Sequence, residues 1–413
     1  MQLRCFDPNC ATTLPLHAAA LECPRCHGLL EVEVDAPQQS ASELKELWAN
    51  RRRSRDARDI SGVWRYREFL PAYAADEVVT LGEGNTPLVR GHRTAEFAGV
   101  GDLQFKHLGW NPTGCFKDLG MTVGMTEARH MKATVVACAS TGNTAASLAA
   151  YAARAGVAGR VYLPAGQVSL NKLAQALDFG AEIVEVEGSF DDALNTLLAK
   201  TSEGIYFLNS INPFRVEGQK TTMFELLDQL DWQAPDYLVL PGGNLGNSAA
   251  FSKAFEEMLR FGLIERAPKM IVVQAAGANP FAQMWRTGAA MLTPVAEPET
   301  IATAIRIGNP RSWQKALRGV KATGGQVLDV TDAEIGEAKA VIGRDGIGCE
   351  PASAATLAGL RKLRTSGEIP ASASVVAILT GHVLKDTNFI IQSHQKQSQH
   401  HQENQAEANH AHS

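Results

Sequence analysis

Short β-branched hydrophobic runs alternate with helix-like segments along most of the chain. The runs at 103–108, 134–139, 160–164 and 182–187 are followed by segments with helical patterning at 116–131, 143–155, 169–178 and 190–203. Further strand-like runs occur at 205–210, 237–241, 270–275, 327–330 and 375–380, with helices between most of them. A parallel crossover needs a dozen or more residues, which a helix supplies, so this alternation predicts an α/β fold with parallel sheets covered by helices. So many strands favour two sheets over one.

The first part of the chain departs from this alternation. Cys5, Cys10, Cys23 and Cys26 form two close pairs ahead of a strand-like run at 29–34. This spacing predicts a ribbon-like segment over residues 1–33 in which four thiolates surround a zinc ion. A metal-free relic of such a ribbon, or ordinary buried thiols, are the alternatives.

Two further segments flank the α/β region, which we assign to residues 81–386 as two lobes. Residues 34–80 are polar and helical and are expected to form a connector, with the arginines of the run 51–55 on a solvated helix face. The last residues, rich in Gln and His, predict a disordered tail over 387–413.

Composition narrows the class of protein. The 413 residues are 45% apolar and 20% charged, which is typical of a soluble globular chain. A net charge of −5 does not indicate the excess of basic residues that is typical of nucleic-acid-binding proteins. No stretch of about 20 apolar residues predicts a membrane span, and no apolar run behind Met1 predicts a secretory signal, so we expect a cytoplasmic protein.

Four short polar segments each follow a predicted strand, where open α/β sheets bind their ligands. The first, Asn111 to Asp118, places Lys117 at the opening of a helix. A desolvated lysine with a lowered pKa can attack a carbonyl group, although most lysines at such positions are surface residues. The second runs from Ser140 through Thr141 to Thr144, and its hydroxyls and free backbone N–H groups suit a carboxylate.

The third and fourth segments supply a different chemistry. Residues 241–247 carry glycines that let the backbone approach a phosphate closely, although an unliganded tight turn would use them equally well. The segment fits neither a P-loop nor a dinucleotide fingerprint. Thr380 ends the last strand, where its hydroxyl could meet a heterocyclic nitrogen.

Together the four segments offer the groups that a pyridoxal phosphate enzyme needs. These are a lysine, a phosphate-binding loop, a carboxylate-binding segment and a hydroxyl at the end of the last strand. Four motifs resemble those of the threonine synthase family. They are Asn-Pro-Thr-Gly-Cys-Phe-Lys-Asp at 111–118, Gly-Glu-Gly-Asn-Thr-Pro-Leu at 82–88, the segment 209–220 and Gly-Gly-Asn-Leu-Gly-Asn at 242–247. That family belongs to the fold-type II pyridoxal phosphate enzymes, whose fold is that of the tryptophan synthase β subunit. The likeness covers about residues 80–386 and is greatest for the plant-type branch.

The resemblance implies a role for each site residue. Lys117 would hold the cofactor covalently and move protons. Cofactor contacts would come from Asn143, Gly243, Asn244, Leu245, Gly246, Asn247 and Thr380. The family substrate is O-phospho-L-homoserine: its carboxylate would lie at Ser140, Thr141 and Asn143, and its phosphate at Thr144, Asn209, Ser210, Arg215 and Asn244. The products would be L-threonine and phosphate.

The resemblance leaves alternatives open. Another fold-type II lyase, similar to threonine dehydratase or cysteate synthase, would have no need of a second anion seat at Arg215. A zinc-ribbon binding protein with an inactive scaffold is disfavoured by the intact Lys117. Cys115 and Val383 depart from the residues usual in the family. A homodimer is expected from the plant-type likeness and from the frequency of symmetric dimers.

Overall fold

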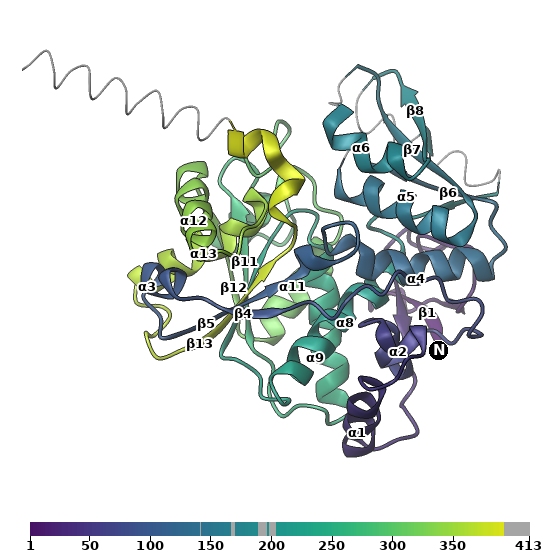
Figure 1. Ribbon diagram of the computed structural model, residues 1–413, viewed down its shortest axis with the longest axis horizontal. Coiled ribbons are helices and arrows are strands. Elements are labelled where there is room, and N and C mark those ends of the chain that lie inside the picture. Colours follow the sequence, from purple (N-terminus) through teal and green to yellow (C-terminus); the bar gives the residue numbers. More distant parts are fainter. Residues whose placement is uncertain (141, 167–169, 189–195, 198–203, 392–413) are drawn as a thin grey trace, which may run out of the picture.

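The computed structural model describes residues 1–140, 142–166, 170–188, 196–197 and 204–391. These residues form three sheets, with strand orders β2-β1-β3, β12-β11-β10-β13-β5-β4 and β8-β7-β6-β9. Figure 1 shows the six-stranded sheet and its helices on one side of the molecule and the four-stranded sheet on the other.

The six-stranded sheet is buried on both faces. Its strands are β4 (Leu88–Arg90), β5 (Asp102–His107), β10 (Tyr237–Pro241), β11 (Lys269–Ala275), β12 (Gln326–Val330) and β13 (Ser374–Leu379). One face packs against α8 (Pro213–Gln229), α9 (Gly246–Arg260) and α11 (Trp313–Ala322). The other packs against α3 (Arg93–Ala98), α12 (Asp332–Arg344) and α13 (Pro351–Thr365), while α10 (Pro280–Thr287) follows β11. Burial on both faces explains why the central strands are almost continuously apolar.

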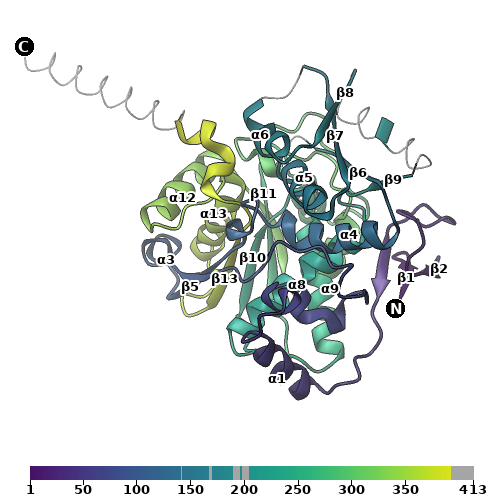
Figure 2. The ribbon, with the colours of Figure 1, turned by 45° about the vertical axis from the view of Figure 1, so that its right-hand side comes forward.

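The four-stranded sheet is parallel throughout. It contains β6 (Val135–Ala139), β7 (Ala158–Pro164), β8 (Glu182–Val186) and β9 (Ile205–Phe207). Helices α4 (Lys117–His130), α5 (Asn143–Ala155) and α6 (Leu170–Asp178) share a hydrophobic core with it. Figure 2 shows α4, α5 and α6 on the side that faces the larger sheet.

The amino-terminal segment forms an antiparallel ribbon that leads into helices packed in the core. The ribbon strands are β1 (Gln2–Cys5), β2 (Thr13–Pro15) and β3 (Leu30–Glu33). Helix α1 (Ala41–Arg51) begins with a capping box between Ser40 and Glu43 and is followed by α2 (Ala57–Ile60) and η1 (Trp64–Phe69). Trp48, Trp64 and Tyr66 are fully buried, so this segment contributes to the core as well as connecting the ribbon to the rest.

The structure corrects the expectations for the larger sheet and for the arginine run. The larger sheet is mixed, because β4 runs antiparallel to β5 and was too short to stand out as a hydrophobic run. The solvated helix face expected for the arginine run is wrong at Arg51, which is buried and donates to Glu68 at 2.8 Å. Its guanidinium is retained in the core because a carboxylate neutralises it.

Other expectations are confirmed, are wrong in part or lie outside the described residues. Each of the nine predicted strands of the α/β region is present within one to three residues of its expected bounds. Most of the helix expected at 190–203 falls on residues that the structure does not describe. The disordered tail expected over 387–413 is wrong at its first residues, because 387–391 are helical, and 392–413 are not described. No helix in the described ranges is long and apolar enough to cross a membrane.

Candidate active site

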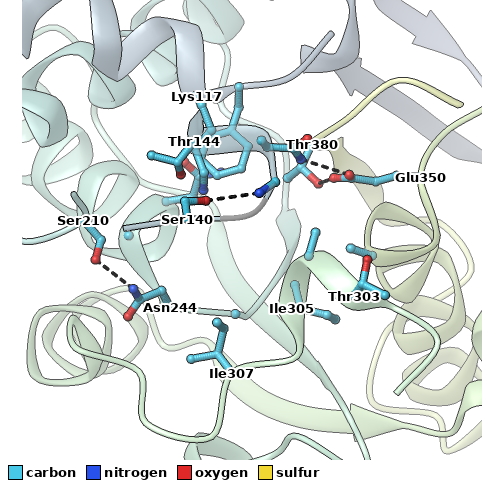
Figure 3. Close-up of a pocket in the computed structure, with 18 of the residues that line it drawn as sticks. Lys117, Ser140, Thr144, Ser210, Asn244, Thr303, Ile305, Ile307, Glu350 and Thr380 are labelled. Atoms are coloured by element: carbon cyan, nitrogen blue, oxygen red, sulfur yellow. Dashed lines mark hydrogen bonds between the residues drawn. The ribbon is translucent and has the colours of Figure 1, made fainter. Parts of the chain in front are cut away.

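A cleft of about 1450 Å³ lies at the carboxyl ends of the parallel strands. Every described residue that the sequence assigned to cofactor or substrate lines it: Lys117, Ser140, Asn143, Thr144, Asn209, Ser210, Arg215, Gly243, Asn244, Leu245, Gly246, Asn247 and Thr380. Thr141 lies outside the described residues. Figure 3 shows Lys117, Ser140, Thr144 and Thr380 turned toward the same space, with Ser210 and Asn244 across from them.

Lys117 is the first residue of α4, and its ammonium group is destabilised there. Burial lowers the pKa of Lys117 to about 8, and the positive charge of Arg215 acts in the same direction. The preceding loop is fixed by Asp118, which accepts hydrogen bonds from the Thr113 amide at 2.7 Å and the Thr113 hydroxyl at 2.6 Å. A lysine held in this way can supply a neutral amine near neutral pH.

The segment after β6 forms one wall of the cleft. Helix α5 begins at Asn143 without a side-chain cap, so its first backbone N–H groups are free to bind a ligand. The Ser140 hydroxyl accepts from the Gly142 amide at 3.3 Å. Free amides at a helix start are suited to an anion such as a carboxylate.

The glycine-containing loop between β10 and α9 fits a bound phosphate. Leu245 adopts a left-handed conformation (φ 63°) and α9 starts at Gly246 with no side-chain cap. A Cβ at Gly243 would lie 3.1 Å from the Cα of Ile305, so a larger residue would require that neighbour to move, and glycine allows the close approach. The Ser248 hydroxyl is fully buried without a partner in the described structure. A phosphate bound here would accept hydrogen bonds from this buried hydroxyl and from the free amides at the start of the helix.

Arg215 is a buried cation in the same cleft. It is the third residue of α8, which Asn212 caps through its side chain. The residue is 2% exposed, and among the described residues its side chain forms one hydrogen bond, from Nη1 to the carbonyl of Leu208 at 3.2 Å. Burial lowers the pKa of Arg215 to about 10, which still leaves it charged at neutral pH. It pairs with no carboxylate in the described ranges, and buried charges require a partner, so the site favours an anionic ligand.

Glu350 is one of several cleft residues that the sequence did not predict, and it bonds directly to two of the predicted ones. It lies immediately before α13, and its carboxylate accepts from Asn143 Nδ2 at 3.1 Å and from the Thr380 hydroxyl at 2.9 Å. The one signal in the sequence is a glutamate placed among apolar residues ahead of a helix that starts with Pro351. Glu350 and Thr380 lie far apart in the sequence, and only the tertiary fold brings them together.

The two residues that depart from the family motifs lie beside the cleft. The Cys115 thiol is buried, 3.7 Å from the Thr113 hydroxyl and 3.9 Å from the carbonyl of Asn143. Val383 packs against Gly348, where a Cβ added to the glycine would lie 3.4 Å from the valine Cβ. Neither displaces Lys117 from the cleft.

The four ribbon cysteines converge on one point outside the cleft. Their sulfur atoms all lie within 4.8 Å of one another, and none is in a disulfide. The Sγ atoms of Cys5 and Cys26 are 3.4 Å apart, and those of Cys10 and Cys23 are 3.7 Å apart. Four thiolates around one centre are the donor set that zinc prefers.

Comparison with known proteins identifies the family of the chain. Residues 79–381 match the family model described as "Pyridoxal-phosphate dependent enzyme". The chain is 47% identical to threonine synthase of Methanocaldococcus jannaschii over 395 residues, 95% of each chain. It is 46% identical to threonine synthase of Methanosarcina acetivorans over 391 residues, 94% of this chain and 93% of that one.

Solved structures show the same fold. Threonine synthase from Escherichia coli aligns with a TM-score of 0.70 at 20% identity, over 93% of this chain and 89% of that chain. The processed form of threonine deaminase isoform 2 from Solanum lycopersicum aligns with a TM-score of 0.63 at 18% identity, over 85% and 88%. The fold is therefore that of a pyridoxal phosphate-dependent enzyme of fold type II. Within this class the chain belongs to the threonine synthase family.

Proposed function

We propose that the protein converts O-phospho-L-homoserine and water into L-threonine and phosphate, by loss of phosphate from Cγ and addition of water at Cβ. The observation that carries this proposal is Arg215, a buried cation without a carboxylate partner in the described structure, in the same cleft as Lys117. A substrate with a carboxylate and a phosphate needs two anion seats, and the cleft offers a second one at Arg215.

Each cofactor contact in the proposal is a cleft residue. Lys117 would bind pyridoxal phosphate through its ε-amino group and later move protons at the substrate carbons. Gly243 to Asn247 would hold the cofactor phosphate, Asn143 the ring hydroxyl and Thr380 the ring nitrogen. When bound, the cofactor supplies an electron sink for the carbanions that form at the substrate.

The substrate contacts form two groups, one for each anionic end of the substrate. Ser140, Thr141 and Asn143 would take the carboxylate. Thr144, Asn209, Ser210, Arg215 and Asn244 would take the phosphate. The side chain of Asn244 is already oriented for this, since it donates to the Ser210 hydroxyl at 2.7 Å and accepts from the Arg311 amide at 2.6 Å.

The test compares two substrates on the same preparation. We expect turnover of O-phospho-L-homoserine and little or no 2-oxobutanoate from L-threonine. Rapid deamination of L-threonine would favour the dehydratase alternative. Lys117→Ala should abolish the visible absorbance of bound cofactor together with activity, whereas retention of that band would overturn the assignment of Lys117.

We further propose that residues 1–33 form a zinc-binding unit, with 34–80 linking it to the catalytic region 81–386 and 387–413 as a tail. The convergence of Cys5, Cys10, Cys23 and Cys26 supports this. Zinc measured at one ion per chain, and lost in Cys23→Ser, is the expected result. Protein that contains no metal when purified in the presence of zinc would contradict it.

We also propose that the protein works in the cytoplasm as a homodimer and is closest in type to the plant branch. The loop Gly-Gly-Asn-Leu-Gly-Asn at 242–247 supports the plant-type likeness, although both relatives named above are archaeal. Light scattering on the eluting protein measures the assembly directly.

A further inference from the structure

Glu350 is a buried carboxyl group that faces the cleft without a counter-ion. Its side chain is 3% exposed, and it forms no ion pair with a lysine, arginine or histidine of the described ranges. Although Glu350 occupies the N-cap of α13, its carboxyl group does not bond to the free amides of that helix. Instead it bonds to Asn143 and Thr380, two residues proposed to contact the cofactor ring (Figure 3).

The direction of the hydrogen bonds at Thr380 follows from Ser353. The Ser353 oxygen accepts from the backbone amides of Thr380 at 2.8 Å and Gly381 at 3.3 Å. Because both of its lone pairs are then used, its own hydrogen is left for Thr380 Oγ1, 2.9 Å away. Thr380 can therefore accept one more hydrogen bond and donate one.

The protonation state of Glu350 decides where the single hydrogen of the Thr380 hydroxyl goes. An ionised Glu350 accepts that hydrogen, and Thr380 then offers the cleft only a lone pair. A neutral Glu350 instead donates from Oε1 to Thr380, which leaves the threonine hydrogen free to point into the cleft. The hydrogen bond from Asn143 is compatible with both the ionised and the neutral form of Glu350. Asn143 donates to the second carboxyl oxygen, which keeps its lone pairs when the proton is on Oε1.

Several forces act on that protonation. Burial raises the pKa of Glu350, and the hydrogen bonds from Thr380 and Asn143 together with the charges of Lys385 and Lys117 oppose the rise. A bound cofactor would bring a phosphate dianion and exclude water from the cleft. Both changes favour the neutral acid.

We propose that Glu350, as a neutral acid, orients the Thr380 hydroxyl to donate to the ring nitrogen of the cofactor and so keeps that nitrogen unprotonated. Glu350 is thus a positioning residue that acts through Thr380. The inference rests on the proposed function, because it requires Thr380 to face the ring nitrogen. An unprotonated ring is the weaker electron acceptor, which favours expulsion of a leaving group over transamination.

The test uses the full chain loaded with pyridoxal phosphate that carries ¹⁵N in the ring. We expect the ¹⁵N chemical shift of an unprotonated nitrogen in the wild type, and an infrared band of a protonated carboxyl group that disappears in Glu350→Gln. The glutamine amide can accept from Asn143 and donate to Thr380, so this variant should keep the unprotonated nitrogen and a kcat within about threefold of wild type. Glu350→Ala leaves both partners unsatisfied, and we expect about a tenfold or larger fall in kcat.

Each outcome decides the proposal. A protonated ring nitrogen in the wild type, or the absence of the carboxyl band, would overturn it even if no variant folds. A Glu350→Gln protein whose nitrogen becomes protonated would also overturn it. Failure of the chain to bind pyridoxal phosphate would overturn the proposed function as well, whereas binding with a protonated nitrogen would leave that function intact.

Discussion

Lys117 and Arg215 both line the cleft with basic side chains, and their repulsion has a measurable consequence. Burial and the charge of Arg215 lower the pKa of Lys117 to about 8, so its amine becomes neutral as the pH rises through that value. Only the neutral amine can attack the aldehyde of pyridoxal phosphate. The electrostatics of the cleft therefore control how the enzyme is loaded.

We expect the rate of cofactor uptake by the apoprotein to rise with pH, with a midpoint near 8. Stopped-flow absorbance at a series of pH values measures it. In Arg215→Met the midpoint should move to higher pH, because removal of a neighbouring positive charge raises the pKa of Lys117. An unchanged midpoint in this variant would show that Arg215 does not influence the lysine.

Arg215→Lys tests the phosphate seat itself. A guanidinium binds phosphate through two parallel hydrogen bonds, which a lysine cannot reproduce. Loss of one hydrogen bond to a charged group predicts an increase in KM of about 10- to 100-fold, with a smaller change in kcat. Arg160→Lys, in a partly exposed pair with Glu182, is the matched control and should leave KM unchanged. Equal effects of the two substitutions would contradict the assignment.

The individual cleft residues show what could and could not be predicted from the sequence. Four of the cleft segments were predicted because each follows a strand, and the carboxyl ends of parallel strands meet at one edge. Asn209, Ser210 and Arg215 were predicted from the resemblance to threonine synthases instead. Glu350 does not follow a strand: it precedes α13 and reaches Thr380, 30 residues further along the chain, through the packing of α13 beside β13. No local pattern encodes that contact.

Helices α4 and α8 carry Lys117 and Arg215, and two glycines allow these helices to touch. A Cβ at Gly218 would lie 1.9 Å from the carbonyl oxygen of Leu119, and one at Gly120 would lie 2.7 Å from that of Arg215. The backbones are therefore in direct contact near the cleft. This contact sets the relative position of the lysine and the arginine.

Gly218→Ala should force the two helices apart. We expect a loss of about 1–3 kcal/mol of unfolding free energy, as for other overpacked sites, together with reduced kcat/KM. Gly336→Ala in α12 is the matched control, since a Cβ there meets nothing within 4 Å, and it should be neutral or stabilising. Denaturant unfolding of both variants gives the comparison. A Gly218→Ala protein as stable as Gly336→Ala would contradict the close contact.

At the scale of elements, hydrophobic periodicity was sufficient for the parallel strands. Their residues are apolar on both faces because helices cover both, so each appears as a continuous run. Strand β4 has only three residues and is half-buried or exposed, which left no such run. The aromatic residues of η1 pack into the core. Their burial was not predicted, because the segment around them is polar on average.

In the whole molecule the ribbon is attached to both α/β units. Glu31 of β3 pairs with Arg318 of α11 at 3.2 Å, and His17 contacts Glu127 of α4 at 2.9 Å. Arg311, which lines the cleft, contacts Glu22 of the ribbon at 3.4 Å. An ordered ribbon therefore supports elements that border the cleft.

Removal of metal from the ribbon should destabilise the whole chain. Structural zinc contributes directly to folding free energy, so a chelator should lower Tm by several degrees, which corresponds to roughly 2 kcal/mol or more. Cys23→Ser should have a low Tm without chelator and show no further decrease with it. Thermal scans with and without chelator measure this, and an identical Tm in both conditions would contradict a structural metal.

We propose that this cleft makes threonine from a phosphorylated substrate. The most direct measurement incubates the purified protein and pyridoxal phosphate with O-phospho-L-homoserine and quantifies phosphate and amino acids together. We expect equal amounts of phosphate and L-threonine, and neither product with Lys117→Ala. Phosphate released without threonine, or no phosphate released at all, would contradict it.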